Sequence, residues 1–301
     1  MDATTTDRPV IIFGCGYVGK RLAQQLLVNN IPAKGFVSSA GSLAECEQKN
    51  IPCEVLDLDN LHDGINLANH RLIYLVPPPG NGREDTRMRG YLKSISKHPP
   101  QKFVYISTTG VYGDCEGAWI DESTPLNPKA DRAYRRVDAE QQVQQYCDNH
   151  DIPLTILRVA GIYGPGKLPV ARIKSGQPIV NEQDSPFTNR IHADDLVNIC
   201  EKALMNLNIT GTYNVTDGHP STMYEYFNGV AAVLGLPKPP AISLSEAQGK
   251  LSEGMLSYMA ESRRISNDKL LNAFELELLY PNLQQGLEQC VAEQNTGQKS
   301  V

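Results

Sequence analysis

A glycine-rich segment directly after a short apolar run constrains the fold of this chain more than any other feature. The run is Val10–Phe13, typical of a buried strand, and Gly14-Cys15-Gly16-Tyr17-Val18-Gly19 follows at once. Apolar residues then recur at helical spacing as far as Leu27. In this fingerprint the first glycine permits a tight turn, the second admits a pyrophosphate, and the third lets helix and strand pack closely. The six residues of the loop are therefore predicted to bind a dinucleotide.

Further along the chain, apolar runs alternate with amphipathic stretches, as in parallel β-α-β units. Strands are predicted at 33–37, 53–58, 72–76, 103–106 and 154–159, and helices at 84–97 and 132–147. Together with the first strand, these elements predict an α/β fold with a Rossmann-type doubly wound parallel sheet. In such a sheet the ligand binds beyond the carboxyl ends of the strands.

The regular alternation weakens after Gly164, where turn residues become frequent. We therefore expect an NAD(P)-binding Rossmann domain over 8–165 and a smaller C-terminal substrate-binding lobe over 166–291. Elements near 190–217 are expected to return to the Rossmann core. The polar residues 292–301 have no apolar face and are predicted to form a flexible tail.

The composition and charge of the chain indicate which binding partners and which cellular compartment to expect. The net charge of -6 offers no basic surface for nucleic acid or an anionic membrane, and no apolar run is long enough to span a bilayer. A small-molecule substrate and a cytoplasmic location are expected. The seven cysteines are scattered singly without a C-x-x-C pair, and the six histidines lack zinc-site spacing. These patterns predict reduced thiols and no metal.

The end of the second strand bears on the choice of nucleotide. An acidic residue usually reads the ribose 2′-hydroxyl of NAD there, about 20 residues after the glycines. This chain has Val37-Ser38-Ser39 instead. Ser38 is therefore a predicted cofactor residue, and the cofactor is NAD or NADP, with a preference for NADP.

Five segments resemble those of extended short-chain dehydrogenases/reductases of the epimerase/dehydratase kind, in the same order. They are Cys53–Asp59, Val104–Gly113, Leu157–Gly166 with its Y-G-P-G, Arg190–Leu196 with its R-x-H-x-D-D-L-like pattern, and Gly211–Val215. Extended members usually carry G-x-x-G-x-x-G, whereas Phe13 stands here in the first glycine's place. The chain is thus similar to an atypical member of that family.

The resemblance implies further cofactor residues. Asp57 would contact the adenine and Leu58 would lie beside it, and Arg158 belongs to the stretch at which the chain leaves the Rossmann core. Val76 and Pro77 open a run of three prolines after the fourth strand, which we interpret as a rigid wall of the cleft.

The family's Tyr-x-x-x-Lys pair, in which the lysine lowers the pKa of the catalytic tyrosine, is absent. Two alignments of the helix at 132–147 are open. In the first, Tyr134 takes the place of the family's tyrosine, and Asp138 stands one turn later. In the second, Arg136 takes the place of the family's lysine and Arg132 that of its tyrosine; we prefer this second alignment. Tyr134 and Arg136 lie about 200° apart around a helix and cannot act together. The catalytic candidates are Thr108, Tyr112, Tyr134 and Arg136, with Tyr163 as another acid.

The resemblance implies an NAD(P)-dependent oxidoreductase or epimerase that acts on a small polar substrate, such as a sugar nucleotide, by hydride transfer. It also implies a homodimer formed through the helices at 84–97 and 132–147. A catalytically silent NAD(P)-binding sensor is the alternative that the missing pair favours. A methyltransferase that binds S-adenosylmethionine is a third reading, against which the Y-G-P-G and H-A-D-D segments argue.

Overall fold

The computed structural model describes residues 8–61 and 65–297, and the chain divides into two compact units. The first unit comprises Met1–Val111, Pro128–Arg158 and Leu196–Tyr213, and the second comprises Tyr112–Asn127, Val159–Asp195 and Asn214–Val301. Residues 112–127 and 159–165 therefore belong to the second unit, and Leu196–Tyr213 belongs to the first. The expected boundaries of the NAD(P)-binding domain and the substrate-binding lobe stay predictions.

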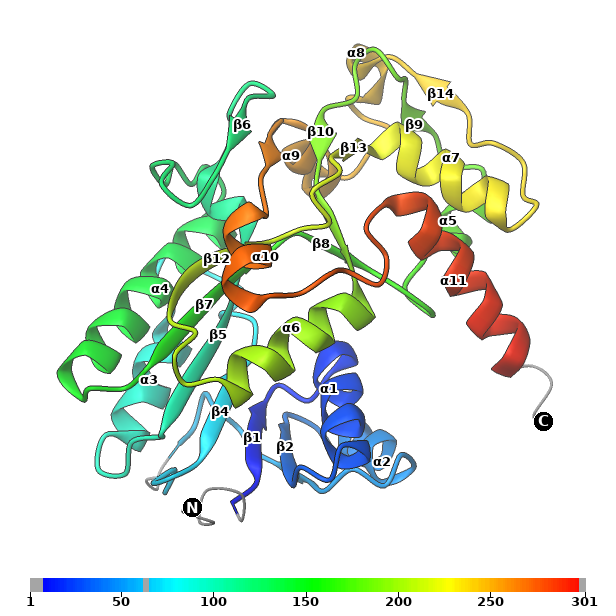
Figure 1. The fold of residues 1–301 in the computed structure, drawn as a ribbon. Helices are drawn as coiled ribbons and strands as arrows, with labels where there is room; N and C mark the ends of the chain where they lie inside the picture. The colour runs from blue at the N-terminus through cyan, green and yellow to red at the C-terminus, as the bar shows by residue number, and fades with distance from the viewer. Residues whose placement is uncertain (1–7, 62–64, 298–301) are drawn as a thin grey trace. The chain divides into compact units, whose positions relative to one another are not determined.

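The first unit is built on a seven-stranded sheet with the order β12-β7-β5-β4-β1-β2-β3 (Figure 1). Its strands are β1 (Val10–Phe13), β2 (Ala33–Val37), β3 (Cys53–Val55), β4 (Arg71–Tyr74), β5 (Lys102–Thr108), β7 (Leu154–Val159) and β12 (Gly211–Val215). The chain moves outward from β1 to β3 and then crosses to β4 on the other side of β1, pairing in parallel throughout this part. The predicted Rossmann-type doubly wound sheet is confirmed, with β12 as a seventh strand.

Helices cover the sheet on both faces. They are α1 (Tyr17–Val28), α2 (Ala40–Glu47), α3 (Thr86–Ile95), α4 (Asp131–Asn149) and α6 (Ala193–Met205). Helices α1 and α6 lie side by side, since the Gln25 amide donates to Asn198 at 2.8 Å. Helix α2 was not predicted, because a single buried residue, Cys46, leaves it without an amphipathic pattern.

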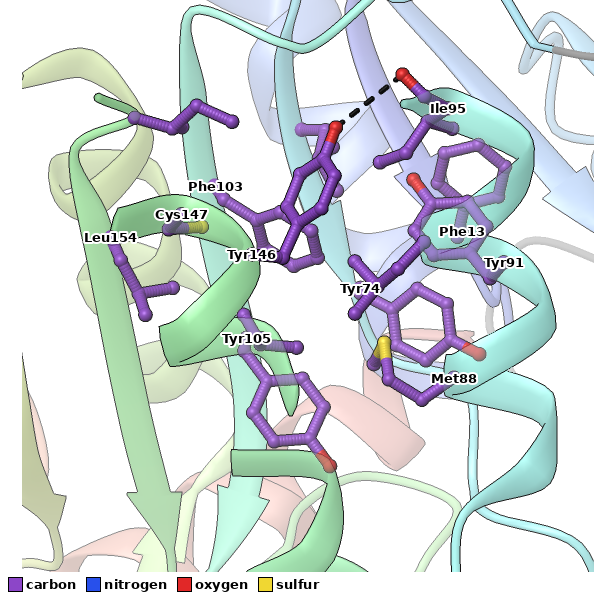
Figure 2. Close-up of a cluster of buried hydrophobic side chains, with 14 of the residues drawn as sticks. Phe13, Tyr74, Met88, Tyr91, Ile95, Phe103, Tyr105, Tyr146, Cys147 and Leu154 are labelled. Carbon is purple, nitrogen blue, oxygen red and sulfur yellow. Dashed lines mark hydrogen bonds between the residues drawn. The ribbon is translucent and has the colours of Figure 1, made fainter. Parts of the chain in front are cut away.

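Helices α3 and α4 pack with the strands around a cluster of large side chains (Figure 2). The ring of Phe13 at the end of β1 stacks on Phe36 at 5.0 Å and meets Tyr91 edge-on at 4.8 Å. Across the cluster, the Tyr146 hydroxyl donates to the Ile95 carbonyl at 3.4 Å. Because Phe13 immediately precedes the glycine loop, this packing holds the start of the loop in place.

The second unit consists of short elements. They are β6 (Trp119–Ile120), β8 (Gly161–Tyr163), α5 (Val170–Lys174), β9 (Ile179–Val180), β10 (Phe187–Thr188), β11 (Arg190–His192), β13 (Ser221–Thr222), α7 (Met223–Val233), β14 (Ala241–Ile242), α8 (Leu244–Ala247), α9 (Glu253–Met259), β15 (Arg264–Ile265), α10 (Asp268–Phe274) and α11 (Leu283–Gly297). Its core gathers around α7 and α11.

The expected flexible tail at 292–301 needs correction. Helix α11 continues to Gly297, anchored by the fully buried Leu287 and Cys290. Helix propagation from an anchored turn adds one hydrogen bond per residue, so polar residues can extend it without an apolar face. Residues 298–301 lie outside the described residues. Across the described ranges, no helix combines the length and apolar character needed to cross a membrane.

Candidate cofactor site

The glycine loop has the geometry that its pattern predicts. Gly14 has a φ of +87°, and a Cβ there would lie 3.0 Å from the backbone of Leu75 and Val76 after β4. A Cβ on Gly19 would lie 2.7 Å from the Gly14 carbonyl oxygen, so the third glycine lets α1 pack against the turn. A Cβ on Gly16 would meet nothing nearer than that same oxygen, at 4.0 Å. The second glycine therefore faces open space.

Helix α1 begins beside this open space. Its N-cap is Gly16, and no side chain caps the helix there. The first backbone N–H groups of a helix carry partial positive charge and bind anions such as a pyrophosphate. The loop and the helix end thus fit the anionic part of a dinucleotide.

A cavity of about 320 Å³ opens at the glycine loop, in the first unit. Its walls come from the residues that follow β1, β2, β3 and β4, at the point where the strand order reverses, which is the ligand site of doubly wound sheets. Eight of the predicted cofactor residues line it: Gly14, Cys15, Gly16, Ser38, Asp57, Leu58, Val76 and Pro77.

Four predicted cofactor residues do not line this cavity. Tyr17, Val18 and Gly19 form the first turn of α1. Arg158 instead forms a buried ion pair with Glu140 of α4, with 2.7 Å between the guanidinium and the carboxylate. Its charge is therefore balanced inside the first unit.

Seven further residues line the cavity and were not predicted from the sequence. They are Phe36, Val37, Ser42, Leu56, Asp59, Leu75 and Arg87. Those that lie at the ends of predicted strands could have been predicted as lining residues, since their neighbours in the sequence were already assigned to the cofactor site. Arg87 has no such signal, because its position depends on partners 10 and 28 residues away.

Arg87 and two carboxylates form the polar wall of the cavity. The Arg87 guanidinium donates to both oxygens of Asp59, at 2.7 and 2.6 Å, and to the Pro77 carbonyl at 2.6 Å. A hydrogen bond from the Asn60 amide and another from the Asp59 backbone hold the pKa of Asp57 below its usual value. Asp57 therefore stays ionised at neutral pH and can accept hydrogen bonds from a ligand.

The end of β2 presents hydroxyl groups to the cavity. Ser38 and Ser42 both line it, and Ser39 caps helix α2 by accepting a hydrogen bond from the Ser42 backbone at 3.2 Å. The two carboxylates of the lining, Asp57 and Asp59, follow β3 rather than β2. A phosphate at the end of β2 would meet hydroxyls and a helix N-terminus.

Two of the catalytic candidates lie at the carboxyl end of the sheet. Thr108 ends β5 and is half-exposed, and its hydroxyl accepts a hydrogen bond from Gly110 at 3.2 Å. The Arg136 guanidinium donates to the Ile106 carbonyl and the Tyr105 hydroxyl, each at 3.1 Å. Burial raises the pKa of Tyr105 to about 12 despite that arginine, so its phenol stays protonated at neutral pH.

The other two candidates have structural partners. Arg83 stacks over the ring of Tyr134, with 4.5 Å between guanidinium carbon and ring centre. Tyr112 lies in the second unit, where its buried hydroxyl donates to Asn214 at 2.9 Å. Tyr163 is also buried in that unit, which raises its pKa. Tyr134 and Arg136 thus have separate partners in the first unit, as their angular separation predicts.

Comparison with known proteins points to one family. The model of the NAD dependent epimerase/dehydratase family matches residues 87–216, which begin after the glycine loop. Protein YeeZ of Escherichia coli (strain K12) is 26% identical over 271 residues, covering 82% of this chain and 92% of YeeZ.

Solved structures agree with this match. A functionally unknown conserved protein from Silicibacter pomeroyi has a TM-score of 0.84 and 29% identity, with 95% of this chain and 98% of that chain covered. The dTDP-glucose 4,6-dehydratase of Bacillus anthracis, solved in complex with NAD, has a TM-score of 0.75 and 16% identity, with 97% of each chain covered, and shares the fold. The family match over residues 87–216, the glycine loop and the sheet order all fit an atypical extended short-chain dehydrogenase/reductase.

Proposed function

We propose that this protein is an NAD(P)-dependent oxidoreductase or epimerase that acts on a small polar substrate, a sugar nucleotide, by hydride transfer. The observation that carries the proposal is the cavity at the strand reversal point, where the second glycine faces open space beside an uncapped helix end. The residues present fit a dinucleotide in both charge and shape.

Each wall of the cavity has a part in holding the cofactor. Gly14 makes the tight turn, Gly16 would admit the pyrophosphate, Asp57 would accept hydrogen bonds from the adenine, and Val76 and Pro77 close the side beyond β4. Arg87 keeps that side in place through its bonds to Asp59 and Pro77. A bound nicotinamide supplies the hydride acceptor and donor that the protein's own side chains lack.

NADP fits the end of β2 better than NAD does. In NAD-specific sites a carboxylate at this position accepts hydrogen bonds from the ribose 2′-hydroxyl and repels a 2′-phosphate. Here the hydroxyls of Ser38 and Ser42 take its place. The N-terminus of α2 adds favourable charge for a phosphate.

When hydride leaves a substrate alcohol for the nicotinamide, the hydroxyl proton must also leave, and we propose that it passes to a water held by Thr108. Arg136 is fixed at the end of β5 and carries a permanent charge, so it orients and neutralises rather than donates. Thr108, half-exposed at the same strand end, can hold a substrate hydroxyl or a water by hydrogen bonding. We assign Arg136 as the group that anchors the cofactor and Thr108 as the group that orients the reacting oxygen.

Sugar nucleotides are the proposed substrate class because related folds take them. The similar Bacillus anthracis protein is a dTDP-glucose 4,6-dehydratase, and another similar protein, from Thermotoga maritima, is a UDP-glucose 4-epimerase solved with UDP-glucose. A homodimer, a cytoplasmic location, and the absence of nucleic-acid and membrane partners remain predictions.

The test is an assay of the full-length protein with NADP⁺ or NAD⁺ and a panel of UDP- and dTDP-linked sugars. We expect at least one sugar nucleotide to be oxidised or epimerised, seen as reduced-nicotinamide absorbance or as a new sugar by NMR. The Arg136→Ala variant should lose this activity, whereas Arg89→Ala, on the exposed side of α3, should keep it.

A silent NAD(P)-binding sensor is the second candidate. The observation that favours it is the stacking of Tyr134 under Arg83, because this contact gives the tyrosine of α4 a structural role. Tight nucleotide binding without turnover of any sugar nucleotide would support the sensor and contradict the proposed enzyme.

A further inference from the structure

Three cysteines that are far apart in the sequence meet beside the glycine loop. They are Cys15 in the loop, Cys46 in α2 and Cys53 at the start of β3, and their sulfur atoms all lie within 4.8 Å of one another. The Cys15 and Cys46 sulfurs are 4.0 Å apart. These cysteines are scattered singly along the sequence, and the fold brings them together because α2 places Cys46 beside the neighbouring strands.

Gly35 in β2 makes room for this cluster. A Cβ at Gly35 would lie 2.8 Å from the Cys15 sulfur, closer than real Cβ atoms come, and 3.1 Å from the Cys53 sulfur, which is a tight contact. The sulfurs thus occupy the space that a side chain on the middle strand would fill. Cys15 and Cys46 are fully buried, whereas Cys53 is half-buried and gives the cluster an opening.

The spacing of the sulfurs matches a metal site. Metal–thiolate bonds are about 2.3 Å long, so three sulfurs in a plane around one ion lie about 4 Å apart. Small rotations of the three side chains would bring separations of up to 4.8 Å to that value. We propose that Cys15, Cys46 and Cys53 form a binding site for one soft, thiophilic metal ion that accepts three sulfur ligands, such as Cu(I).

The ligand set selects the class of ion. Thiolates favour Cu(I) and zinc over magnesium, calcium or manganese. Structural zinc takes four ligands. In the part of the chain that the structure describes, no histidine or carboxylate joins the three sulfurs. Three sulfur donors in a buried setting therefore suit Cu(I) better than Zn(II).

A disulfide is the competing use of the same sulfurs. The Cys15 and Cys46 sulfurs are 4.0 Å apart, whereas a disulfide bond is about 2 Å long, and the three thiols are free in the structure. A metal ion binds the thiolate form and displaces the thiol protons as it binds.

An ion at this site would connect the middle of the glycine loop to α2 and β3. Cys15 stands between the first two glycines and also lines the cofactor cavity. The bound ion would then hold the glycine loop in place. This consequence rests on the proposed function, but ion binding itself does not.

The test is an anaerobic titration of the reduced full-length protein with Cu(I), in competition with a coloured Cu(I) chelator and without nucleotide. We expect one Cu(I) per chain and three sulfur neighbours by X-ray absorption. Cys53→Ser, at the half-buried position, should weaken binding by more than about tenfold, and Cys46→Ala should do the same. Cys200→Ser is the matched control, since Cys200 is buried in α6 outside the cluster.

Circular dichroism of each variant checks that it is folded. The proposal is overturned if the wild type cannot compete with the chelator, or if the folded cluster variants bind Cu(I) as tightly as Cys200→Ser. It is also overturned if absorption data show nitrogen or oxygen neighbours in place of three sulfurs, or if air oxidation yields a disulfide between two of the three cysteines faster than Cu(I) binds.

Discussion

Replacing Glu140 with alanine is expected to lower the free energy of unfolding by about 3–5 kcal/mol. The Glu140 carboxylate accepts hydrogen bonds from Ser107 in β5 at 2.5 Å and from Arg158 in β7 at 2.7 Å. The side chains of Arg158 and Glu140 are only 9% and 6% exposed. The alanine variant would leave the arginine charge buried without this partner, which is far more costly than losing an exposed pair.

Urea or thermal unfolding of Glu140→Ala, Glu140→Gln and a surface control would measure this effect. Glu140→Gln keeps the side-chain volume and some of the hydrogen bonds, so it measures the effect of losing the charge without the effect of an empty space in the core. Glu84→Ala is the control, because it breaks an exposed pair with Arg89 and should cost less than about 1 kcal/mol. A loss at Glu140 no larger than that at Glu84 would show that the buried pair does not hold β5, β7 and α4 together.

Asp217 is expected to make the protein less stable as the pH rises from about 4 to about 7. Its carboxyl group is 3% exposed, and burial raises its pKa to about 7 despite a hydrogen bond from the His219 backbone. Between the unfolded and folded pKa values, the folded chain binds more protons than the unfolded chain, so the free energy of unfolding falls with rising pH. A shift of about three pKa units corresponds to about 4 kcal/mol as an upper bound.

Asp217→Asn removes this titration while keeping the shape of the side chain. We expect the variant to gain stability relative to the wild type as the pH rises from 4 to 7, measured by urea unfolding at several pH values. Asp121→Asn serves as the control: hydrogen bonds from Ser123 lower the pKa of Asp121, so its contribution changes only below about pH 4, and its difference from the wild type should stay constant from about pH 4 to about 7. A difference between Asp217→Asn and wild type that is constant across this pH range would contradict the prediction.

Local patterns explain which parts of the fold could be predicted. Strands β1, β2 and β7 have the predicted bounds because each is a short, mainly apolar segment ended by glycine, serine or a change of pattern. The glycine loop combined with the strand before it was enough to place the cofactor cavity. The predicted strand at 53–58 proved longer than β3, which ends at Val55, because apolar residues of the following loop line the cavity instead.

Features that depend on distant partners could not be predicted. The pairing of Arg87 with Asp59 and the meeting of Cys15, Cys46 and Cys53 both arise from packing between separate elements, and their spacings in the sequence carry no motif. Arg158 was assigned to the cofactor by resemblance, whereas the structure pairs it with Glu140, a residue on another element. Helix α2 shows the same limit, because its place is set by the strands on either side of it rather than by an apolar face.

Binding of NAD(P) at the glycine loop is tested most directly by calorimetric titration of the wild type and Gly16→Asp with NADPH and NADH. A Cβ at Gly16 would lie no closer than 4.0 Å to the Gly14 carbonyl oxygen, so the variant should fold, while its carboxylate would repel the pyrophosphate. We predict micromolar binding of the wild type, tighter for NADPH than for NADH, and loss of binding in Gly16→Asp. Failure of the wild type to bind either nucleotide, or equal binding by the folded variant, would contradict NAD(P) binding at this loop.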